Sequence, residues 1–439
     1  MLDYKPLDQP PLELNHSAEQ LLELTHAAIE ASRSRLDLIA ANPPTEWTFE
    51  NFIVPLAEDE NDQLLQSSIV GIYQYVSREK EIRDSSRTAI QLWTEYSYEV
   101  NSRLDIFQGI DAIHSRCQDG TIKLKAEERH YLNKLHSTYR RNGAHLSNES
   151  DREQYQILQK RCHQLGGECI RNLQEEAEGI WFTEADLRGV PEAYMSSLKQ
   201  DSDGKLFVGL KKYDIDMILK FASEGGTRER LFIAADNKCS QNVPLVGQLF
   251  SCRAEVAHLL GYASYAEYTI QGRMLDISQV RKLLESVQKQ VVNQAAAEKA
   301  VLMETKRQHL ISEGKTEDEI DCRIHIWDLN FYIRLTKESK YDIDELAVSE
   351  YFPLQPTLAG LLQIFEQLFG LRFHKISQPA WVWDDAVTIL TAWNEEELGG
   401  DFLGYIYFDL FGRPGKYNNN CMITFAPVSC PRVSQKGFH

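Results

Sequence analysis

Apolar residues recur at helical spacing over most of this 439-residue chain, and this periodicity constrains its fold more than any other feature. In the first such stretch, Leu22, Ile29 and Leu36 repeat every seven residues. Ser17 can cap this helix together with Gln20, which follows three residues later in a capping box, and Pro43-Pro44 ends it. The pattern therefore predicts a long amphipathic helix between Ser17 and Pro43.

Further stretches carry the same periodicity. We expect helices over residues 62–113, 126–141, 151–178, 243–260, 277–313 and 357–369. The stretch 281–313 is rich in Lys, Gln, Ala and Glu, which indicates one long exposed helix. Six apolar side chains on these stripes are expected to be buried, namely Leu249, Leu259, Leu260, Leu361, Leu362 and Phe369.

Strand signals are few, and most of them come late in the chain. We expect short strands at residues 206–210, 388–390, 405–408 and 421–425, the last after an asparagine-rich turn. The sequence therefore predicts a mainly α protein with a small β-sheet near the C-terminus.

Composition and charge limit the possible functions. The formal net charge is −18, which disfavours a general nucleic-acid binder because contact with phosphates needs a basic surface. The N-terminal residues have neither the apolar core of a secretory signal nor the arginines of a mitochondrial transit peptide, and no apolar run predicts a membrane span. Eight cysteines without paired short spacing indicate reduced thiols. These features together predict a cytoplasmic protein.

A search for catalytic and metal-binding motifs finds none. No two of the twelve histidines stand four residues apart, so no helix can present the two imidazoles of a His-Glu-x-x-His zinc site. Cys322 with His325, and the group Cys162, His163 and Cys169, are better explained by packing or surface exposure. The sequence Asp201-Ser-Asp-Gly predicts a turn rather than a calcium loop. From these patterns alone we assign no catalytic residue and no metal ligand.

A series of segments, taken in order, nevertheless resembles one family. The most specific are Thr48-Phe-Glu-Asn, Arg141-Asn-Gly, Thr227-Arg through Asn242, Leu259-Leu-Gly-Tyr, and Gly404-Tyr-Ile-Tyr-Phe-Asp-Leu followed by Arg413, Gly415 and Lys416. These segments are similar to blocks of the thimet oligopeptidase family of zinc metallopeptidases, peptidase family M3, which includes neurolysin and saccharolysin. The resemblance implies the multi-lobed helical body of a zincin-like oligopeptidase, which admits short peptides to a channel between its lobes.

The resemblance also implies what this chain lacks. Family members continue from the Arg-x-Gly-Lys block to a helix with His-Glu-x-x-His, which holds the zinc ion, but this sequence ends at His439 before such a motif. We therefore expect a C-terminally truncated chain without the zinc helices, with no bound zinc and no hydrolysis. One wall of the channel can remain, and with it an edge strand at Asn420, Cys421 and Met422 against which a peptide could lie by β-augmentation.

The resemblance suggests three segments and leaves three interpretations open. The segments are 1–145, an N-terminal helical region; 146–326, a helical lobe forming one channel wall; and 327–439, the start of the catalytic region. The chain could be an incomplete zinc oligopeptidase, a non-catalytic peptide-binding or regulatory relative, or a helical scaffold. The expected partners are short peptides, not nucleic acid or membrane, and the oligomeric state stays open.

Overall fold

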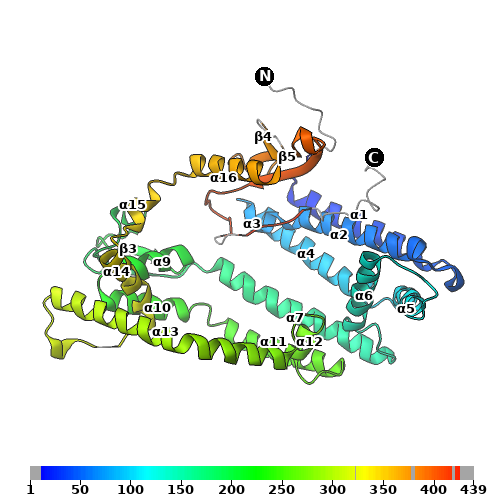
Figure 1. Ribbon diagram of the computed structural model, residues 1–439, viewed down its shortest axis with the longest axis horizontal. Coiled ribbons are helices and arrows are strands. Elements are labelled where there is room, and N and C mark those ends of the chain that lie inside the picture. Colours follow the sequence, from blue (N-terminus) through cyan, green and yellow to red (C-terminus); the bar gives the residue numbers. More distant parts are fainter. Residues whose placement is uncertain (1–10, 322, 377–380, 418–420, 426–439) are drawn as a thin grey trace. The chain divides into compact units, whose positions relative to one another are not determined.

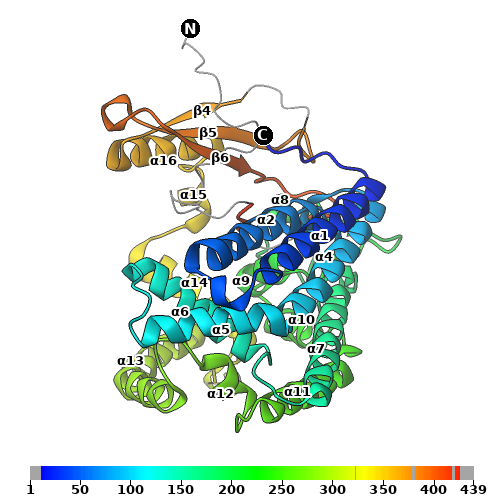
Figure 2. The same ribbon diagram turned by 90° about the vertical axis from the view of Figure 1, so that its right-hand side faces the viewer.

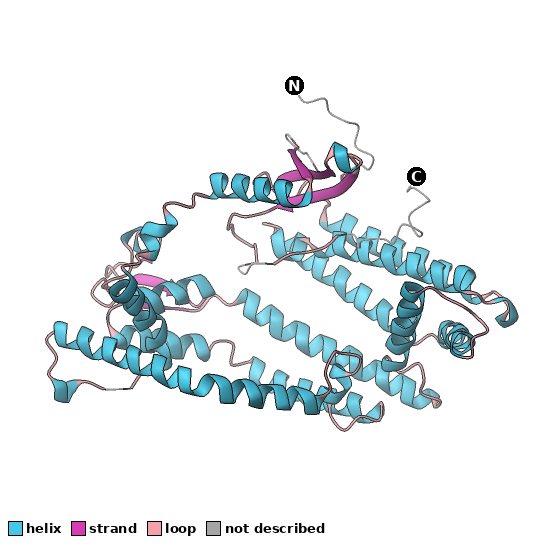
Figure 3. Cartoon of the chain, viewed as in Figure 1, coloured by secondary structure: helices cyan, strands magenta, loops and turns pink. Residues whose placement is uncertain are grey.

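The computed structural model describes residues 11–321, 323–376, 381–417 and 421–425. Helices dominate these residues, and two small antiparallel sheets accompany them (Figures 1 and 3), so the predicted mainly α fold class is confirmed. The chain divides into two compact units. Unit 1 comprises Met1–Lys160, His258–Gly261 and Thr357–His439, and unit 2 comprises Arg161–Ala257 and Tyr262–Pro356. The sequence-based division into segments 1–145, 146–326 and 327–439 assigns functions to parts of the chain. The two compact units do not test it, so it stays a prediction.

The N-terminal part of unit 1 is a group of packed helices. They are α1 (Ala18–Ala40), α2 (Val54–Gly71), α3 (Tyr73–Val76), α4 (Lys80–Asn101), α5 (Leu104–Gln118) and α6 (Ala126–Arg141). The predicted capping box starts α1, because the Ser17 hydroxyl accepts from Gln20 N (3.3 Å) and Gln20 Oε1 accepts from Ser17 N (2.8 Å). The stretch expected as one helix over 62–113 is divided among α2 to α5. Short helical turns occupy Pro44–Glu46 and Phe49–Ile53.

Helices α1, α2 and α4 lie side by side (Figure 2) around a core in which Leu21, Phe52 and Ile53 are fully buried. A buried carboxylate also lies among them. Asp59 accepts hydrogen bonds of 2.7 Å from Ser32 Oγ, Gln63 Nε2 and Arg35 Nε. Its charge is therefore compensated, which a buried carboxylate requires.

The C-terminal part of unit 1 contributes helix α16 (Leu354–Phe369) and a sheet of β4 (Leu371–Lys375), β5 (Thr388–Asn394) and β6 (Phe402–Phe408), in the order β4-β5-β6. The sequence predicted the positions of β5 and β6 but missed β4. The prediction of a strand over residues 421–425 is wrong, because these residues pair with no strand. Instead, Ile423 and Phe425 pack against the helical core of unit 1, and Ser68 Oγ donates to Thr424 O (3.1 Å).

Unit 2 is also mainly helical. Helix α7 (Glu149–Glu175) begins in unit 1 and continues into unit 2. The other helices are α8 (Glu192–Met195), α9 (Lys212–Phe221), α10 (Gly225–Asp236), α11 (Asn242–Leu259), α12 (Tyr265–Ile270), α13 (Ile277–Ser312), α14 (Leu329–Tyr341) and α15 (Glu345–Ser349). Strands β1 (Gly179–Phe182), β3 (Leu206–Gly209) and β2 (Lys199–Gln200) pair in that order. The sequence predicted β3 but missed β1 and β2.

A second buried carboxylate joins the helices of unit 2. Asp328 accepts from Arg228 Nη2 (2.6 Å) and from Lys306 Nζ (2.9 Å), and all three residues are buried. The Arg228 guanidinium also lies 4.3 Å from the centre of the Phe331 ring. These contacts connect α10, α13 and α14. Among the described residues, no helix is long and apolar enough to cross a membrane.

The burial predictions were only partly correct. Leu249 and Leu260 are buried, but Leu259 and Leu362 are only half-buried and Leu361 and Phe369 are exposed. Three of these four failures lie on α16, whose apolar stripe no described element covers. Over its middle, residues 281–300, helix α13 is the exposed helix that its composition predicted.

We expect Gly109→Ala to destabilise unit 1, because a Cβ there would lie 2.2 Å from the Phe52 ring inside the core. The overpacking should lower the free energy of unfolding by about 1–3 kcal/mol in urea titrations followed by circular dichroism. Gly360→Ala, on an open face of α16 with nothing within 4 Å, is the control and should be neutral or stabilising. An equal effect of both changes would contradict the packing described for α5.

We expect the exposed stripe of α16 to bind the dye 8-anilinonaphthalene-1-sulfonate, since Ile364 and Leu368 are 53% and 70% exposed. Replacing both with lysine should reduce the dye fluorescence and leave the melting temperature unchanged. The matched control adds the same charges at Gln363 and Gln367, which are also exposed, and should keep the fluorescence. A fall of several degrees in the first variant alone would mean that the stripe is covered.

Candidate functional site

The segment after β6 is fixed to the N-terminal helices by one carboxylate, Asp409. Its oxygens accept from Arg413 Nη1 (2.6 Å) and Nη2 (2.7 Å), from Lys416 Nζ (2.8 Å) and from Trp383 Nε1 (2.9 Å). Lys416 Nζ also donates to the carbonyl oxygens of Asp409 and Phe411, at 2.7 Å each. The loop from Asp409 to Lys416 is thus closed on itself.

Arg413 connects this loop to the N-terminal helices. It donates through Nη2 (2.8 Å) and Nε (3.2 Å) to Val76 O, at the end of α3. Asp384 lies 3.3 Å from Arg413 Nε and pairs with Arg78 at 2.6 Å. Tyr417 N then donates to Tyr75 O (2.7 Å). We call Asp409, Arg413, Lys416, Trp383 and Asp384 the Asp409 clasp.

Gly415 has a positive φ of 83° and lies against the α3–α4 connection. A Cβ there would be 2.4 Å from Arg83 Nη1 and 2.7 Å from Ser77 O. The position therefore excludes any side chain, both by conformation and by space. This explains why a glycine stands between Arg413 and Lys416.

Burial raises the pKa of Asp409, but the hydrogen bonds from Arg413, Lys416 and Trp383 outweigh it and hold this pKa at about 2. A carboxyl whose folded-state pKa is depressed stabilises the fold above its unfolded value near 3.8. This contribution is lost as the pH falls towards the folded value. The clasp should therefore weaken between about pH 4 and pH 2.

The predicted substrate strand is the least supported part of the sequence analysis. Asn420 lies outside the described residues. Cys421 and Met422 are exposed, Met422 at 90%, and neither belongs to a strand. The residues that follow turn their apolar side chains to the helical core of unit 1 through Ile423 and Phe425.

The structure also places the side chains considered as metal ligands. His325 bonds to Asp321 Oδ2 (2.7 Å) and stacks on the Trp327 ring, and Cys322 lies outside the described residues. Cys162 and Cys169 are free thiols. Within the described ranges, no three His, Cys, Asp or Glu side chains converge as metal ligands must. Asp201 accepts from Asp203 N and Lys205 N, which confirms the turn.

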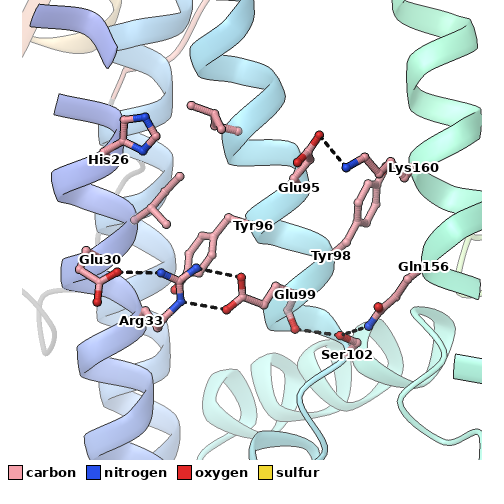
Figure 4. Close-up of a pocket in the computed structure, with 12 residues that line it drawn as sticks. His26, Glu30, Arg33, Glu95, Tyr96, Tyr98, Glu99, Ser102, Gln156 and Lys160 are labelled. Carbon is pink, nitrogen blue, oxygen red and sulfur yellow. Dashed lines mark hydrogen bonds and ion pairs between the residues drawn. The ribbon is translucent and has the colours of Figure 1, made fainter. Parts of the chain in front are cut away.

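A groove of about 730 Å³ opens between α1, α4 and the first turns of α7, all within unit 1 (Figure 4). Its lining mixes apolar and charged side chains: His26, Ile29, Glu30, Arg33, Leu92, Glu95, Tyr96, Tyr98, Glu99, Ser102, Gln156 and Lys160. The sequence analysis missed it, because the lining comes from three helices and forms no motif along the chain.

Arg33 fixes one side of the groove. Its Nε and Nη2 bond both oxygens of Glu99 (3.0 and 2.9 Å), and its Nη1 bonds Glu30 (2.7 Å) (Figure 4). These bonds, first of all those to Glu99, raise the pKa of Arg33 above its usual value. The Arg33 guanidinium is therefore held in place by the carboxylates of Glu30 and Glu99.

The other side of the groove connects α4 to α7 by weaker contacts. Lys160 Nζ lies 3.2 Å from Glu95 Oε1, and Gln156 Nε2 donates to Ser102 Oγ (2.7 Å) (Figure 4). Half-exposed ion pairs of this kind contribute about 0–1 kcal/mol. The groove thus offers apolar area, three carboxylates against two cations, and readily displaced polar partners, a lining that suits binding.

Comparisons with known proteins identify the family. Residues 218–436 match the model of peptidase family M3. Saccharolysin of Saccharomyces cerevisiae is 31% identical over 379 residues, which cover 84% of this chain and 53% of the relative. The probable thimet oligopeptidase of Arabidopsis thaliana is 27% identical, with 93% and 56% covered. Oligopeptidase A of Escherichia coli is 23% identical, with 94% and 60% covered.

The mainly helical fold agrees with these matches. The chain belongs to peptidase family M3. It spans about half the length of the curated relatives it matches. Asp409, Arg413 and Lys416 of the Asp409 clasp, and Gly415 between them, lie inside the matched region.

We expect Asp409→Asn to destabilise unit 1, because it neutralises the carboxylate partner of the half-buried Arg413 and Lys416. Breaking a fully buried ion pair costs about 3–5 kcal/mol, so the loss here should be smaller than this. Asp385→Asn, at the exposed neighbouring residue of the clasp, is the control. Urea titrations at pH 7 should show the loss in Asp409→Asn alone. Below pH 4 the wild type should approach this variant, and parallel pH profiles of the two proteins would contradict the assignment.

Proposed function

We propose that this chain is the peptide-binding part of an M3 oligopeptidase and that its ligands are short peptides. The observation that carries the proposal is the similarity to saccharolysin, which extends over 84% of the chain. Two other relatives are named oligopeptidases, the thimet-type protein of Arabidopsis and oligopeptidase A of Escherichia coli. The groove between α1, α4 and α7 supports the proposal, because its mixed lining suits a peptide backbone with varied side chains.

Zinc is the metal of this family, and it would supply an activated water for peptide hydrolysis. The residues described here do not fit the ion, because no three potential ligands converge among them. No catalytic step is therefore derived through zinc. We propose that the 439 residues by themselves bind peptides without hydrolysing them, which the absence of paired histidines four residues apart in the sequence supports.

Two finer proposals accompany this one. Asn420, Cys421 and Met422 would serve as the substrate edge, which the exposure of Cys421 and Met422 supports. A cytoplasmic location is supported by the free thiols of Cys117, Cys162, Cys169, Cys239, Cys252 and Cys421.

A second candidate function is that of a scaffold or regulatory partner of another polypeptide. The uncovered stripe of α16 favours it, with Ile364, Leu368 and Phe369 more than half exposed. Peptide affinity separates the two functions, because a scaffold has no need of the groove.

We expect the purified chain to contain no stoichiometric zinc and to leave a quenched-fluorescent oligopeptide uncleaved, with or without added zinc. Metal analysis by mass spectrometry and a fluorescence assay check both. Stoichiometric zinc with chelator-sensitive turnover would overturn this expectation.

The same preparation should bind a fluorescein-labelled oligopeptide in anisotropy titrations. Gln156→Trp, which places a large ring in the groove, should weaken this binding at least tenfold. Gln108→Trp on the exposed side of α5, outside the groove, is the matched control and should bind like the wild type. Equal affinities of the two variants would exclude the groove, and no binding at all would favour the scaffold.

A further inference from the structure

Two histidines on neighbouring helices of unit 1 form a face-to-face stack. The rings of His114 on α5 and His136 on α6 are 4.1 Å apart at their centres and 4° from parallel. The Phe107 ring continues the stack on the other side of His136, at 5.8 Å and 19°. The contact between α5 and α6 therefore includes two titratable rings in direct van der Waals contact.

The polar partners of the two rings differ. His136 Nε2 lies 2.9 Å from Asp111 Oδ1, so the hydrogen on this nitrogen has a carboxylate acceptor. His114 Nε2 lies 3.4 Å from the Gln118 amide nitrogen, which can donate only to an unprotonated ring nitrogen. His114 is thus arranged to stay neutral.

The other groups around the pair are few. Asn133 on α6 also interacts with His114, and Asp111 is the nearby carboxylate on α5 itself. The segment Phe49–Ile53 meets α5 through Phe52, which lies against Gly109. Helix α1 meets the start of α5 through Asp37, whose charge is paired with Arg103 (2.6 Å). The charged groups that act on His114 are therefore His136 and Asp111.

We propose that the His114–His136 stack is an acid-sensitive latch between α5 and α6. The latch keeps the helical hairpin closed while at most one ring is protonated, and it opens the hairpin when both rings carry a charge. The reason is that two imidazolium rings whose centres are 4.1 Å apart repel each other.

The direction of the pH dependence follows from the state of His114. Burial, and next the charge of His136, lower the pKa of His114 below its ordinary value of 6.5. The open hairpin therefore binds protons more readily than the closed one as the pH falls below 6.5. Closure is fully stable above this pH and weakens below it, well before the Asp409 clasp begins to titrate.

Amide hydrogen exchange on the full chain tests the latch. After correction for the intrinsic exchange rates, peptides from Leu104–Arg141 should lose protection about tenfold between pH 7.5 and pH 5, while peptides from α1 keep theirs. His114→Phe preserves the stacked ring and removes the titration, so its protection should not change with pH. His130→Phe, at an exposed histidine on α6, is the matched control and should behave like the wild type.

A second measurement keeps the test decisive if His114→Phe folds poorly. Asp111→Asn removes the carboxylate that compensates charge on the pair, so the loss of protection between pH 7.5 and pH 5 should be larger than in the wild type. Unchanged protection in the wild type at pH 5, or the same loss in His114→Phe, would overturn the latch. A loss of protection that Asp111→Asn leaves the same as in the wild type would overturn it as well.

Discussion

A half-buried carboxylate, Asp409, anchors contacts between parts of unit 1 that are far apart in the sequence. Arg413, which Asp409 orients, bonds the carbonyl of Val76 at a separation of 337 residues. Such closure costs conformational entropy, and scattered surface contacts cannot offset this cost. The clasp can offset this cost, because its two carboxylate oxygens accept four hydrogen bonds. Each of these bonds is stronger than the same bond would be on an exposed surface.

Unit 2 contains a similar arrangement, in which one carboxylate is paired with two cations. Asp328 accepts from Arg228 at a separation of 100 residues and from Lys306 at a separation of 22, and so connects α10, α13 and the start of α14. In both units one carboxylate faces two cations. Removing the carboxylate leaves two positive charges without their partner. Removing one cation leaves the carboxylate paired with the other cation. Replacing either carboxylate should therefore cost its unit more than replacing one of the cations.

The sequence predicted what depends on neighbouring residues. The Ser17–Gln20 capping box, the helix over 126–141 and the exposed α13 needed only local spacing and composition. It failed where the outcome depended on distant partners. The apolar stripe of α16 predicted burial, but no described element covers it. Residues 421–425 have the composition of a strand, yet they pack as an irregular segment against the N-terminal core. The resemblance supplied Asp409, Arg413 and Lys416, while their partners Trp383 and Val76 carry no signal of their own.

Peptide affinity and hydrolysis would rest on different residues in this chain. The groove is shaped by Arg33 with Glu99 and by Lys160 with Glu95, on helices α1, α4 and α7. None of these residues belongs to the segments through which the chain resembles the catalytic region of the family. Two of its three helices, α1 and α4, share the buried core of unit 1, and no metal ligand lies among the contacts that join them to α7. Peptide binding in this groove, as proposed above, would therefore depend on these side chains and not on zinc.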